Sequence, residues 1–268
     1  MIELIKAGML DEVDRSKFYT DTENFALIDA DSMLYYCIKE GTTFEEAKIK
    51  LDMFMFQTLE KLQTPIYVAL ITPRETFRQK IGITKKYKGN RKGRKTPPIF
   101  YGLKAYARDE WDFYEVPNLE ADDCMGLYQN EHSIICSPDK DVIKQIPGKH
   151  WNYGKGEWIT TSEAEAWEFL WLQTVMGDSV DQIPGIPGIG IKTAEKMLIE
   201  VRKEDFPLRI LQAYIDKNED ESGIKISVDK FKETLDLVYI LRSKEELDRY
   251  RIELPPIQKS DIRERYAT

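Results

Sequence analysis

Acidic residues gather in four short motifs that could hold metal ions: Asp29-Ala-Asp31, Glu120-Ala-Asp-Asp123, Asp139-Lys-Asp141 and Asp178-Ser-Val-Asp181. That many carboxylates brought together would repel one another strongly unless divalent cations neutralised them. Oxygen donors without Cys or His favour Mg²⁺ or Mn²⁺ over zinc. Two such ions about 4 Å apart would suit in-line displacement at phosphorus, one activating water and the other stabilising the leaving oxygen. Any single pair is more often a helix cap or a solvated turn, but the four motifs together favour the metal reading.

One stretch of the chain, Thr76–Arg108, is strongly basic, in contrast to the acidic motifs. From Arg78 to Arg108 the chain has eleven Lys or Arg and no acidic residue, although its net charge is −8. All 47 acidic residues therefore lie elsewhere, and one stretch attracts polyanions while the rest repels them. Tyr87 within it could stack on a base or be an isolated surface aromatic. The alternative for the whole stretch is a solvated run of charge.

A glycine-rich turn, Gly185-Ile-Pro-Gly-Ile-Gly190, precedes Ile191-Lys-Thr-Ala and resembles a helix–hairpin–helix motif. Glycines let a phosphate approach the backbone, and the following helix offers free N–H groups to it, with Lys192 adding charge. Taken alone, the turn could equally be any tight connection between two helices.

The elements that must position these motifs alternate along the chain. Apolar runs predict buried strands at 25–29, 66–71, 112–116 and 133–137, and helical spacing predicts helices at 32–39, 44–62 and 162–176. A small hairpin is expected at 150–160, and the C-terminal third is expected to be mostly helical. The alternation favours an α/β fold with a mostly parallel sheet, in which Asp29 and Asp139 follow strands and meet at one edge. The basic stretch, with little apolar periodicity, is expected to project from this core as a mobile segment.

Composition sets further limits on this chain of 268 residues. No run of 18 uncharged apolar residues appears, and the N-terminus lacks the apolar region of a signal peptide. Three cysteines without CxxC spacing argue against a disulfide scaffold or a zinc site. We therefore expect a cytoplasmic protein with no membrane contact.

In this order, the motifs resemble the bacteriophage 5′–3′ exonuclease and flap endonuclease family, which is related to the 5′-nuclease domain of bacterial DNA polymerase I. The match runs from about Phe25 to Glu200. Its most specific piece is the run from Gly177 to Gly190, which joins two carboxylates directly to the hairpin. The run Tyr87-Lys-Gly-Asn-Arg91 also fits closely.

The resemblance implies a PIN-like α/β core over residues 1–175, with a basic helical arch at about 76–108. Residues 176–268 would form a helical region that carries the hairpin and packs on the core. The implied enzyme is a monomeric, Mg²⁺-dependent nuclease that cuts DNA at 5′ ends or 5′ flaps. Whether it also cuts RNA–DNA hybrids stays open. If the protein is phage-encoded, its location is the cytoplasm of the infected host.

By the same resemblance, Asp29, Glu120 and Asp122 would serve the first of two Mg²⁺ or Mn²⁺ ions. Asp141, Asp178 and Asp181 would serve the second, with Asp139 between the ions and Asp123 nearby. Lys88 and Arg91 would contact the scissile phosphate, so that these two and Asp139 form the catalytic set. Tyr87 would stack on the unpaired nucleotide. The residues expected to bind DNA are Arg78, Lys85, Lys86, Tyr87, Lys88, Arg91, Gly185, Gly188, Gly190 and Lys192, and a K⁺ ion could lie at the hairpin.

One departure concerns an Asp that the family usually carries after the second strand. Here Thr72 or Pro73 stands at that place. Either Glu75 substitutes for it, or the first ion is held more loosely. Asp31 is expected to contact a metal-holding residue or to cap a helix.

Two other functions stay open. Asp29-Ala-Asp31 after a strand also resembles the nucleophile and acid of haloacid-dehalogenase-like phosphatases, although the Asp178–Asp181 spacing is one residue short of that pattern. A non-catalytic protein that binds flaps or duplex DNA with the same fold is the second alternative, because the missing Asp could weaken the chemistry.

Overall fold

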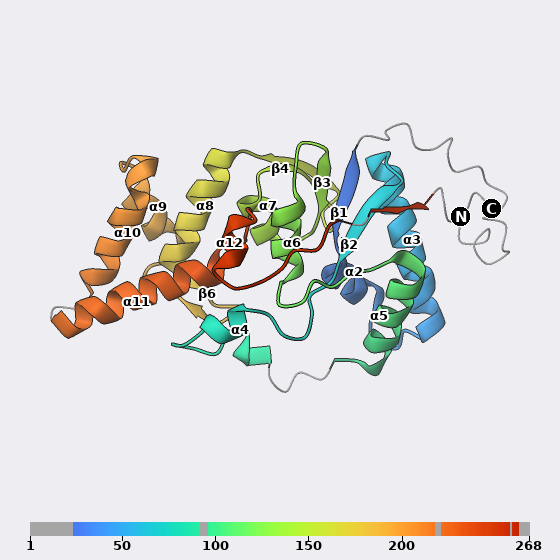
Figure 1. The fold of residues 1–268 in the computed structure, drawn as a ribbon, viewed down its shortest axis with the longest axis horizontal. Helices are drawn as coiled ribbons and strands as arrows, with labels where there is room; N and C mark the ends of the chain where they lie inside the picture. The colour runs from blue at the N-terminus through green and yellow to red at the C-terminus, as the bar shows by residue number, and fades with distance from the viewer. Residues whose placement is uncertain (1–23, 92–95, 218–220, 258, 263–268) are drawn as a thin grey trace.

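A mixed, mostly parallel sheet forms the centre of the protein (Figure 1). The computed structural model describes residues 24–91, 96–217, 221–257 and 259–262. Within them the main sheet has the strand order β5-β4-β3-β1-β2-β8. The central strands β2, β1, β3 and β4 run parallel, and the two edge strands are antiparallel to their neighbours. The strands are β1 (Phe25–Asp29), β2 (Ile66–Leu70), β3 (Ser133–Cys136), β4 (Gly148–Asn152), β5 (Glu157–Thr161) and β8 (Ser260–Asp261).

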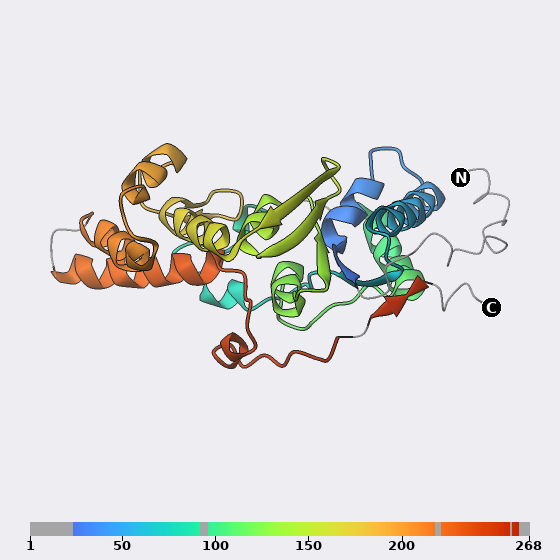
Figure 2. The ribbon, with the colours of Figure 1, turned by 90° about the horizontal axis from the view of Figure 1, so that it is seen from above.

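Helices cover both faces of this sheet, as Figure 2 shows from above. Side chains alternate along β1, so Ala26 and Ile28 join one apolar cluster while Phe25 and Leu27 join the other. The first cluster is completed by α2 (Ala30–Cys37), α3 (Phe44–Leu62) and α5 (Pro98–Trp111). The second is completed by α6 (Ala121–Tyr128), α7 (Lys140–Gln145) and the segment after α11.

A helical part extends from one end of the sheet (Figure 1). It contains α8 (Glu163–Met176), α9 (Ile191–Leu198), α10 (Phe206–Ile215) and α11 (Glu221–Val238), with a separate apolar core around Trp171 and Phe206. A two-stranded sheet of β6 (Gly177–Asp178) and β7 (Ile183–Pro184) connects α8 to the hairpin before α9. The short helices α4 (Arg78–Ile81) and α12 (Glu245–Asp248) and the 3₁₀ turns η3 (Gly89–Arg91) and η4 (Lys203–Asp205) complete the described elements.

The α/β prediction is confirmed, but the strand predicted at 112–116 is wrong. That run forms only an isolated bridge between Tyr114 and Leu70, although Phe113 and Val116 are buried. Burial explains its apolar character, because these side chains fill space beside the sheet without extending the hydrogen-bond ladder.

The predicted arch at 76–108 is also too long. Phe100, Leu103, Ala107 and Trp111 recur at helical spacing and bury one face of α5 against α2 and α3, so α5 belongs to the core. Residues 92–95 of the predicted arch lie outside the described residues. We call residues 82–91, which follow α4, the basic segment.

The C-terminal segment also differs from the predicted division of the chain at 175/176. After α11, Ile240, Leu241, Leu247 and Ile252 pack into the second apolar cluster, and β8 pairs with β2. The chain therefore returns from the helical part to the sheet. Residues 1–23 of the predicted core and 263–268 of the predicted helical region lie outside the described residues.

Among the helices that the structure describes, none has the length and apolar character needed to cross a bilayer.

Replacing Gly126 in α6 by Ala should destabilise the fold. A Cβ there would lie 2.2 Å from the backbone oxygen of Leu241, which neither backbone can easily avoid. Overpacking of this kind costs about 1–3 kcal/mol, to be measured as the free energy of unfolding in urea. The matched control is Gly102→Ala in α5, where the added methyl meets only the ring of Phe44 at 3.2 Å. Equal stability of the two variants would contradict the prediction.

Candidate functional site

Three of the acidic motifs stand where helices begin. Asp29 ends β1 and caps α2, accepting hydrogen bonds from Ser32 N at 3.2 Å and Ser137 Oγ at 2.8 Å. Asp139 caps α7 and accepts from Asp141 N at 2.7 Å, while Glu120 begins α6. Because β1 and β3 are parallel neighbours, their carboxyl ends bring Asp29 and Asp139 to one edge of the sheet.

The fourth motif joins them from the helical part. A cleft between the two parts is lined by the carboxylates of Glu120, Asp122, Asp141, Asp178 and Asp181. Its remaining wall is formed by Arg78, Tyr87, Gln173, Ile183, Leu237, Val238 and Ile240. The structure thus brings side chains of three predicted motifs into one cleft, and Asp29 and Asp139 are close enough to act on Asp122 electrostatically. Their predicted roles as metal ligands stay predictions.

Burial and crowding disfavour the ionised form of several of these carboxyl groups. Burial, followed by the charge of Asp31, raises the pKa of Asp29 to about 6. Burial, followed by the charge of Asp139, raises the pKa of Asp141 to about 7, and its Oδ1 is buried without a hydrogen-bond partner. The pKa of Asp122 is also raised well above its ordinary value, by burial and then by Asp139 and Asp29. A cation placed among these oxygens would relieve each of these costs.

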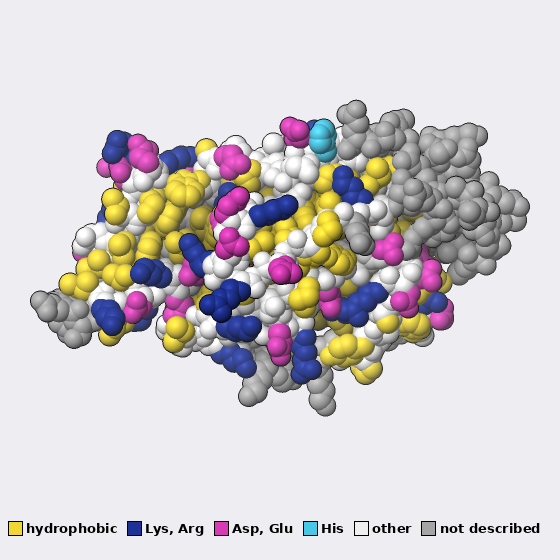
Figure 3. Space-filling view, viewed as in Figure 1, with side chains coloured by type: hydrophobic (Ala, Val, Ile, Leu, Met, Phe, Trp, Pro, Cys, Tyr) yellow, Lys and Arg dark blue, Asp and Glu magenta, His cyan; other side chains and the backbone are white. Residues whose placement is uncertain are grey.

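The basic segment lies against this acidic cleft. Lys88 Nζ is 2.7 Å from Glu120 Oε1 and 3.7 Å from Asp181 Oδ2, and Arg91 Nη2 is 2.5 Å from Asp181 Oδ1. Burial alone would raise the pKa of Glu120, but Lys88 and then Arg78 hold it below its ordinary value. The backbone of the segment is also fixed, because Lys88 N donates to the carbonyl oxygen of Asp181 at 2.9 Å. Figure 3 shows Lys and Arg side chains gathered on this face around α4.

Tyr87 does not have the predicted stacking position. Its side chain is 5% exposed and packs with Leu170, Ile183 and Leu237, and its hydroxyl donates to Glu120 Oε2 at 2.8 Å. A ring enclosed in this way offers no open face to a nucleotide. The apolar neighbours come from α8, β7 and α11, which sequence reasoning could not place beside it.

Arg78 and Asp123 form a buried pair, which corrects both of their predicted roles. Arg78 is 2% exposed and grips both oxygens of Asp123, with Nη2 at 2.7 Å from Oδ1. Arg78 Nε also donates to the carbonyl oxygen of Leu237 at 3.1 Å, and Asp123 accepts from Leu241 N at 3.1 Å. The guanidinium is occupied by these bonds although Arg78 borders the cleft, and Asp123 does not line the cleft. The pair instead ties α4 and α6 to the end of α11.

The hairpin residues lie between the cleft and α9. A Cβ on Gly185 would lie 2.1 Å from the backbone carbon of Met176, so this glycine serves close packing. Gly188 has a φ of 81° and is exposed, as are Gly190 and Lys192 at the start of α9. Lys85 and Lys86 of the basic segment are exposed too. Their predicted contacts with DNA stay predictions.

Thr72 follows β2 and, with Pro73, is one of the two positions at which the resemblance predicts an Asp. Its backbone N–H donates to Asp31 Oδ2 at 2.9 Å, and its hydroxyl accepts from Ala121 N at 3.1 Å. Asp31 therefore does not cap α2, since Asp29 does, but connects that helix to β2. Glu75 is exposed and contributes nothing to the lining of the cleft.

The donor set fits hard divalent cations. In the described part of the chain, no three acidic, His or Cys side chains already converge on one point closely enough to hold an ion. Glu120 and Asp181 are instead turned toward Lys88 and Arg91. Asp141 Oδ1 nevertheless has no hydrogen-bond partner, and the carboxylates around Asp122 repel one another, so the donors available to a cation in this cleft are carboxylate oxygens.

Known proteins are similar to this chain in sequence and in fold. No family model matches the chain. The 5′–3′ exonuclease of Buchnera aphidicola subsp. Acyrthosiphon pisum is 31% identical over 199 residues, which cover 63% of this chain and 67% of that protein. The chain belongs to the 5′–3′ exonuclease family. The predicted family is thereby confirmed, and the phosphatase alternative loses its support.

Two further relatives are a phage exodeoxyribonuclease and a bacterial DNA polymerase I. The exodeoxyribonuclease of Enterobacteria phage T3 is 38% identical over 123 residues, covering 42% of this chain and 40% of that protein. DNA polymerase I of Bacillus subtilis is 28% identical over 210 residues, covering 67% of this chain. The chain spans only 23% of that polymerase.

Solved structures show the same fold. The T5 D15 protein co-crystallised with metal ions has a TM-score of 0.62 at 16% identity, covering 85% of this chain and 96% of that one. A complex of the bacteriophage T5 D15 flap endonuclease with DNA and metal ions has a TM-score of 0.58 at 16% identity, covering 80% of this chain and 88% of that one.

Replacing Arg78 by Met should destabilise the exonuclease strongly. Asp123 would be left as an unpaired buried charge, and breaking such a pair costs about 3–5 kcal/mol. The double variant Arg78→Met with Asp123→Leu should recover most of that loss, because it removes both charges. Urea unfolding measures the stability of all three proteins. A stable single variant that binds DNA more weakly would instead support a phosphate contact for Arg78.

Proposed function

We propose that this exonuclease is a structure-specific 5′ nuclease that hydrolyses phosphodiester bonds at 5′ ends or 5′ flaps of DNA. The observation that carries the proposal is the acidic cleft lying directly against Lys88 and Arg91. A phosphodiester needs cations on its oxygens and an activated water, and this juxtaposition can supply both. Family membership supports catalysis over the non-catalytic alternative.

The cleft would hold two divalent ions, with Mg²⁺ as the expected metal and Mn²⁺ as a substitute. Asp29, Glu120 and Asp122 would bind the first, and Asp141, Asp178 and Asp181 the second, with Asp139 between them. When bound, the ions supply activation of water and neutralise negative charge on the phosphate. Asp123, paired with Arg78, takes no part in this set.

Lys88 and Arg91 would exchange one partner for another during substrate binding. Each now pairs with a carboxylate of the cleft, and each could turn to a phosphate oxygen once cations neutralise those carboxylates. Their positive charge would then stabilise the charge that develops on phosphorus oxygens during hydrolysis. Arg91 is half exposed along its side chain, at 49%, so it has the freedom to make this exchange.

The helical part would grip the duplex without reading its sequence. Gly188, Gly190 and Lys192 present an exposed helix start to a phosphate, and Lys85 and Lys86 add exposed charge from the basic segment. Binding of this kind weakens steeply with salt. The proposal also includes a K⁺ ion at the hairpin, a monomeric state and a cytoplasmic location, which is that of the infected host if the protein is phage-encoded. Whether RNA–DNA hybrids are also cut stays open.

The direct test is cleavage of a 5′-flapped duplex. With Mg²⁺ the protein should release 5′-phosphorylated mono- or oligonucleotides, and with EDTA it should release none. Flap binding that is indifferent to Mg²⁺, with no scission even in Mn²⁺, would favour the non-catalytic protein, provided that circular dichroism shows a folded sample.

Replacing Asp122 by Asn should separate stability from activity. At pH 8 and without metal the variant should unfold at higher urea, because it lacks a partly buried carboxyl group whose charge Asp139 and Asp29 repel. Turnover should fall by at least about 100-fold, the scale seen for loss of one electrostatic group. Mg²⁺ should raise the melting temperature of the wild type more than that of the variant.

The control for this prediction is Asp109→Asn in α5, which changes the same charge on an exposed side chain. Its stability and turnover should match those of the wild type. If Asp122→Asn retained full turnover and the full Mg²⁺ effect, Asp122 would not be a ligand.

A further inference from the structure

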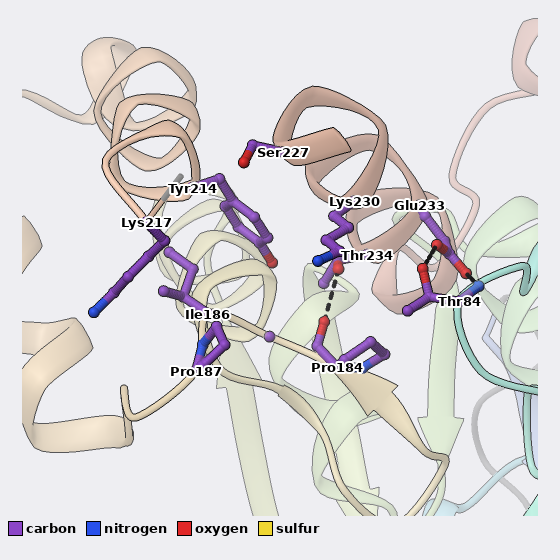
Figure 4. A pocket seen from close by; sticks show the side chains of 11 residues that line it. Thr84, Pro184, Ile186, Pro187, Tyr214, Lys217, Ser227, Lys230, Glu233 and Thr234 are labelled. Carbon is purple, nitrogen blue, oxygen red and sulfur yellow. Dashed lines mark hydrogen bonds between the residues drawn. The ribbon is translucent and has the colours of Figure 1, made fainter. Parts of the chain in front are cut away.

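Glu233 on α11 fastens the start of the basic segment. Its Oε1 accepts a hydrogen bond from Ile83 N at 2.6 Å. Its Oε1 also accepts from Thr84 N at 2.7 Å, and its Oε2 accepts from the hydroxyl of Thr84 (Figure 4). Three donors from two consecutive residues thus converge on one carboxylate. Hydrogen bonds to a charged acceptor are about twice as strong as neutral ones.

Apart from the hydroxyl bond to Glu233, Ile83 and Thr84 themselves make little contact with the rest of the protein through their side chains. The side chain of Ile83 is 87% exposed, so apolar packing does not fix this turn, and Thr84 is exposed as well. Four residues later, Lys88 reaches Glu120. The far side of the segment is held separately, where Lys88 N and Asn90 Nδ2 donate to the carbonyl oxygens of Asp181 and Val180. On the near side of Lys88 the segment is therefore held at two points, by the carboxylate of Glu233 at its start and by the enclosed ring of Tyr87 directly before Lys88.

The next residue on α11 holds the hairpin. Thr234 Oγ1 donates to the carbonyl oxygen of Pro184 at 2.8 Å, and both bonds border one pocket of about 180 Å³ (Figure 4). Two neighbouring residues of a single helix thereby connect the basic segment and the start of the hairpin. Because Glu233 and Thr234 are adjacent on one helix, they fix the distance between the basic segment and the start of the hairpin.

We infer that Glu233 is a positioning residue for hydrolysis: it sets where the basic segment leaves α4, so that Lys88 and Arg91 come to lie over the acidic cleft. This inference rests on the proposed nuclease function. Glu233 acts through the segment and does not itself touch substrate. Its loss should therefore lower the rate of the bound complex and leave the affinity for DNA unchanged, because the hairpin with Lys192 is held by Thr234 and not by Glu233.

The experiment compares Glu233→Gln with Asp229→Asn, which removes the same charge one turn earlier on α11 from an exposed position. On a 5′-flapped duplex with Mg²⁺, Glu233→Gln should lower kcat by about 10-fold, the effect of losing a hydrogen bond to a charged group, with KM unchanged. Asp229→Asn should leave both unchanged. Glu233→Asp, which retains a carboxylate, should recover part of the loss.

Limited trypsin digestion without DNA or metal provides a readout independent of catalysis. Cleavage after Lys85 and Lys86 should accelerate by about 10-fold in Glu233→Gln, since an unfastened segment opens more often. Thr84→Val removes only the hydroxyl donor and should shift digestion and kcat in the same direction by less. If Glu233→Gln does not fold, the digestion rate and kcat of Thr84→Val test the inference in its place.

The outcomes separate the inference from the proposed function. If the wild type cuts DNA but kcat and digestion in Glu233→Gln match the Asp229→Asn control, the inference is overturned and the nuclease stands. A raised KM with unchanged kcat would also overturn it, by making Glu233 part of DNA binding. If trypsin digestion accelerates in Glu233→Gln but the wild type cuts no flap, Glu233 does hold the basic segment and the proposed nuclease function fails.

Discussion

Electrostatic repulsion between crowded, partly buried carboxylates is the constraint on which the rest of this molecule depends. Parallel strands β1 and β3 deliver acidic side chains to one sheet edge, and the loop after α8 adds Asp178 and Asp181 to them. Burial makes each charge more costly, so positive groups must lie within reach. The position of the basic segment, the orientation of Glu120 and the need for divalent cations all follow from that requirement.

The cations around the cleft fall into two kinds. Arg78 is enclosed, bound bidentately to Asp123 and to backbone oxygens, and it holds the structure together. Lys88 and Arg91 contact the same acidic region from a segment that retains partial exposure, with 23% and 49% of their side chains accessible. Only the second kind has the exposure that the proposed exchange of a carboxylate for a phosphate requires. Burial, more than charge, therefore separates a structural cation from one available to substrate.

Much of the fold could be predicted because the strands at 25–29, 66–70 and 133–136 are continuous apolar runs, which few other elements produce. The run at 112–116 carries the same signal for a different reason, namely burial beside the sheet. In α5, the spacing of Phe100, Leu103 and Ala107 marks a core helix, but the surrounding basic residues obscured it. The acidic motifs were visible as pairs, whereas the partner of Asp123 could not be known, since Arg78 lies 45 positions away. Glu233 carried no signal at all, because only the tertiary structure brings it to Thr84.

The strand β8 has a consequence for the behaviour of the protein in concentrated solution. It covers the outer edge of β2, and among the described residues two pairs join the strands, Ile66 with Asp261 and Tyr67 with Ser260, next to a hydrogen bond from Ile262 N to the carbonyl oxygen of Pro65. If this short ribbon frays, β2 presents unpaired backbone groups of an apolar strand to other molecules, and such edges recruit foreign strands. The short pairing of β8 with β2 therefore protects the nuclease from self-association and precipitation.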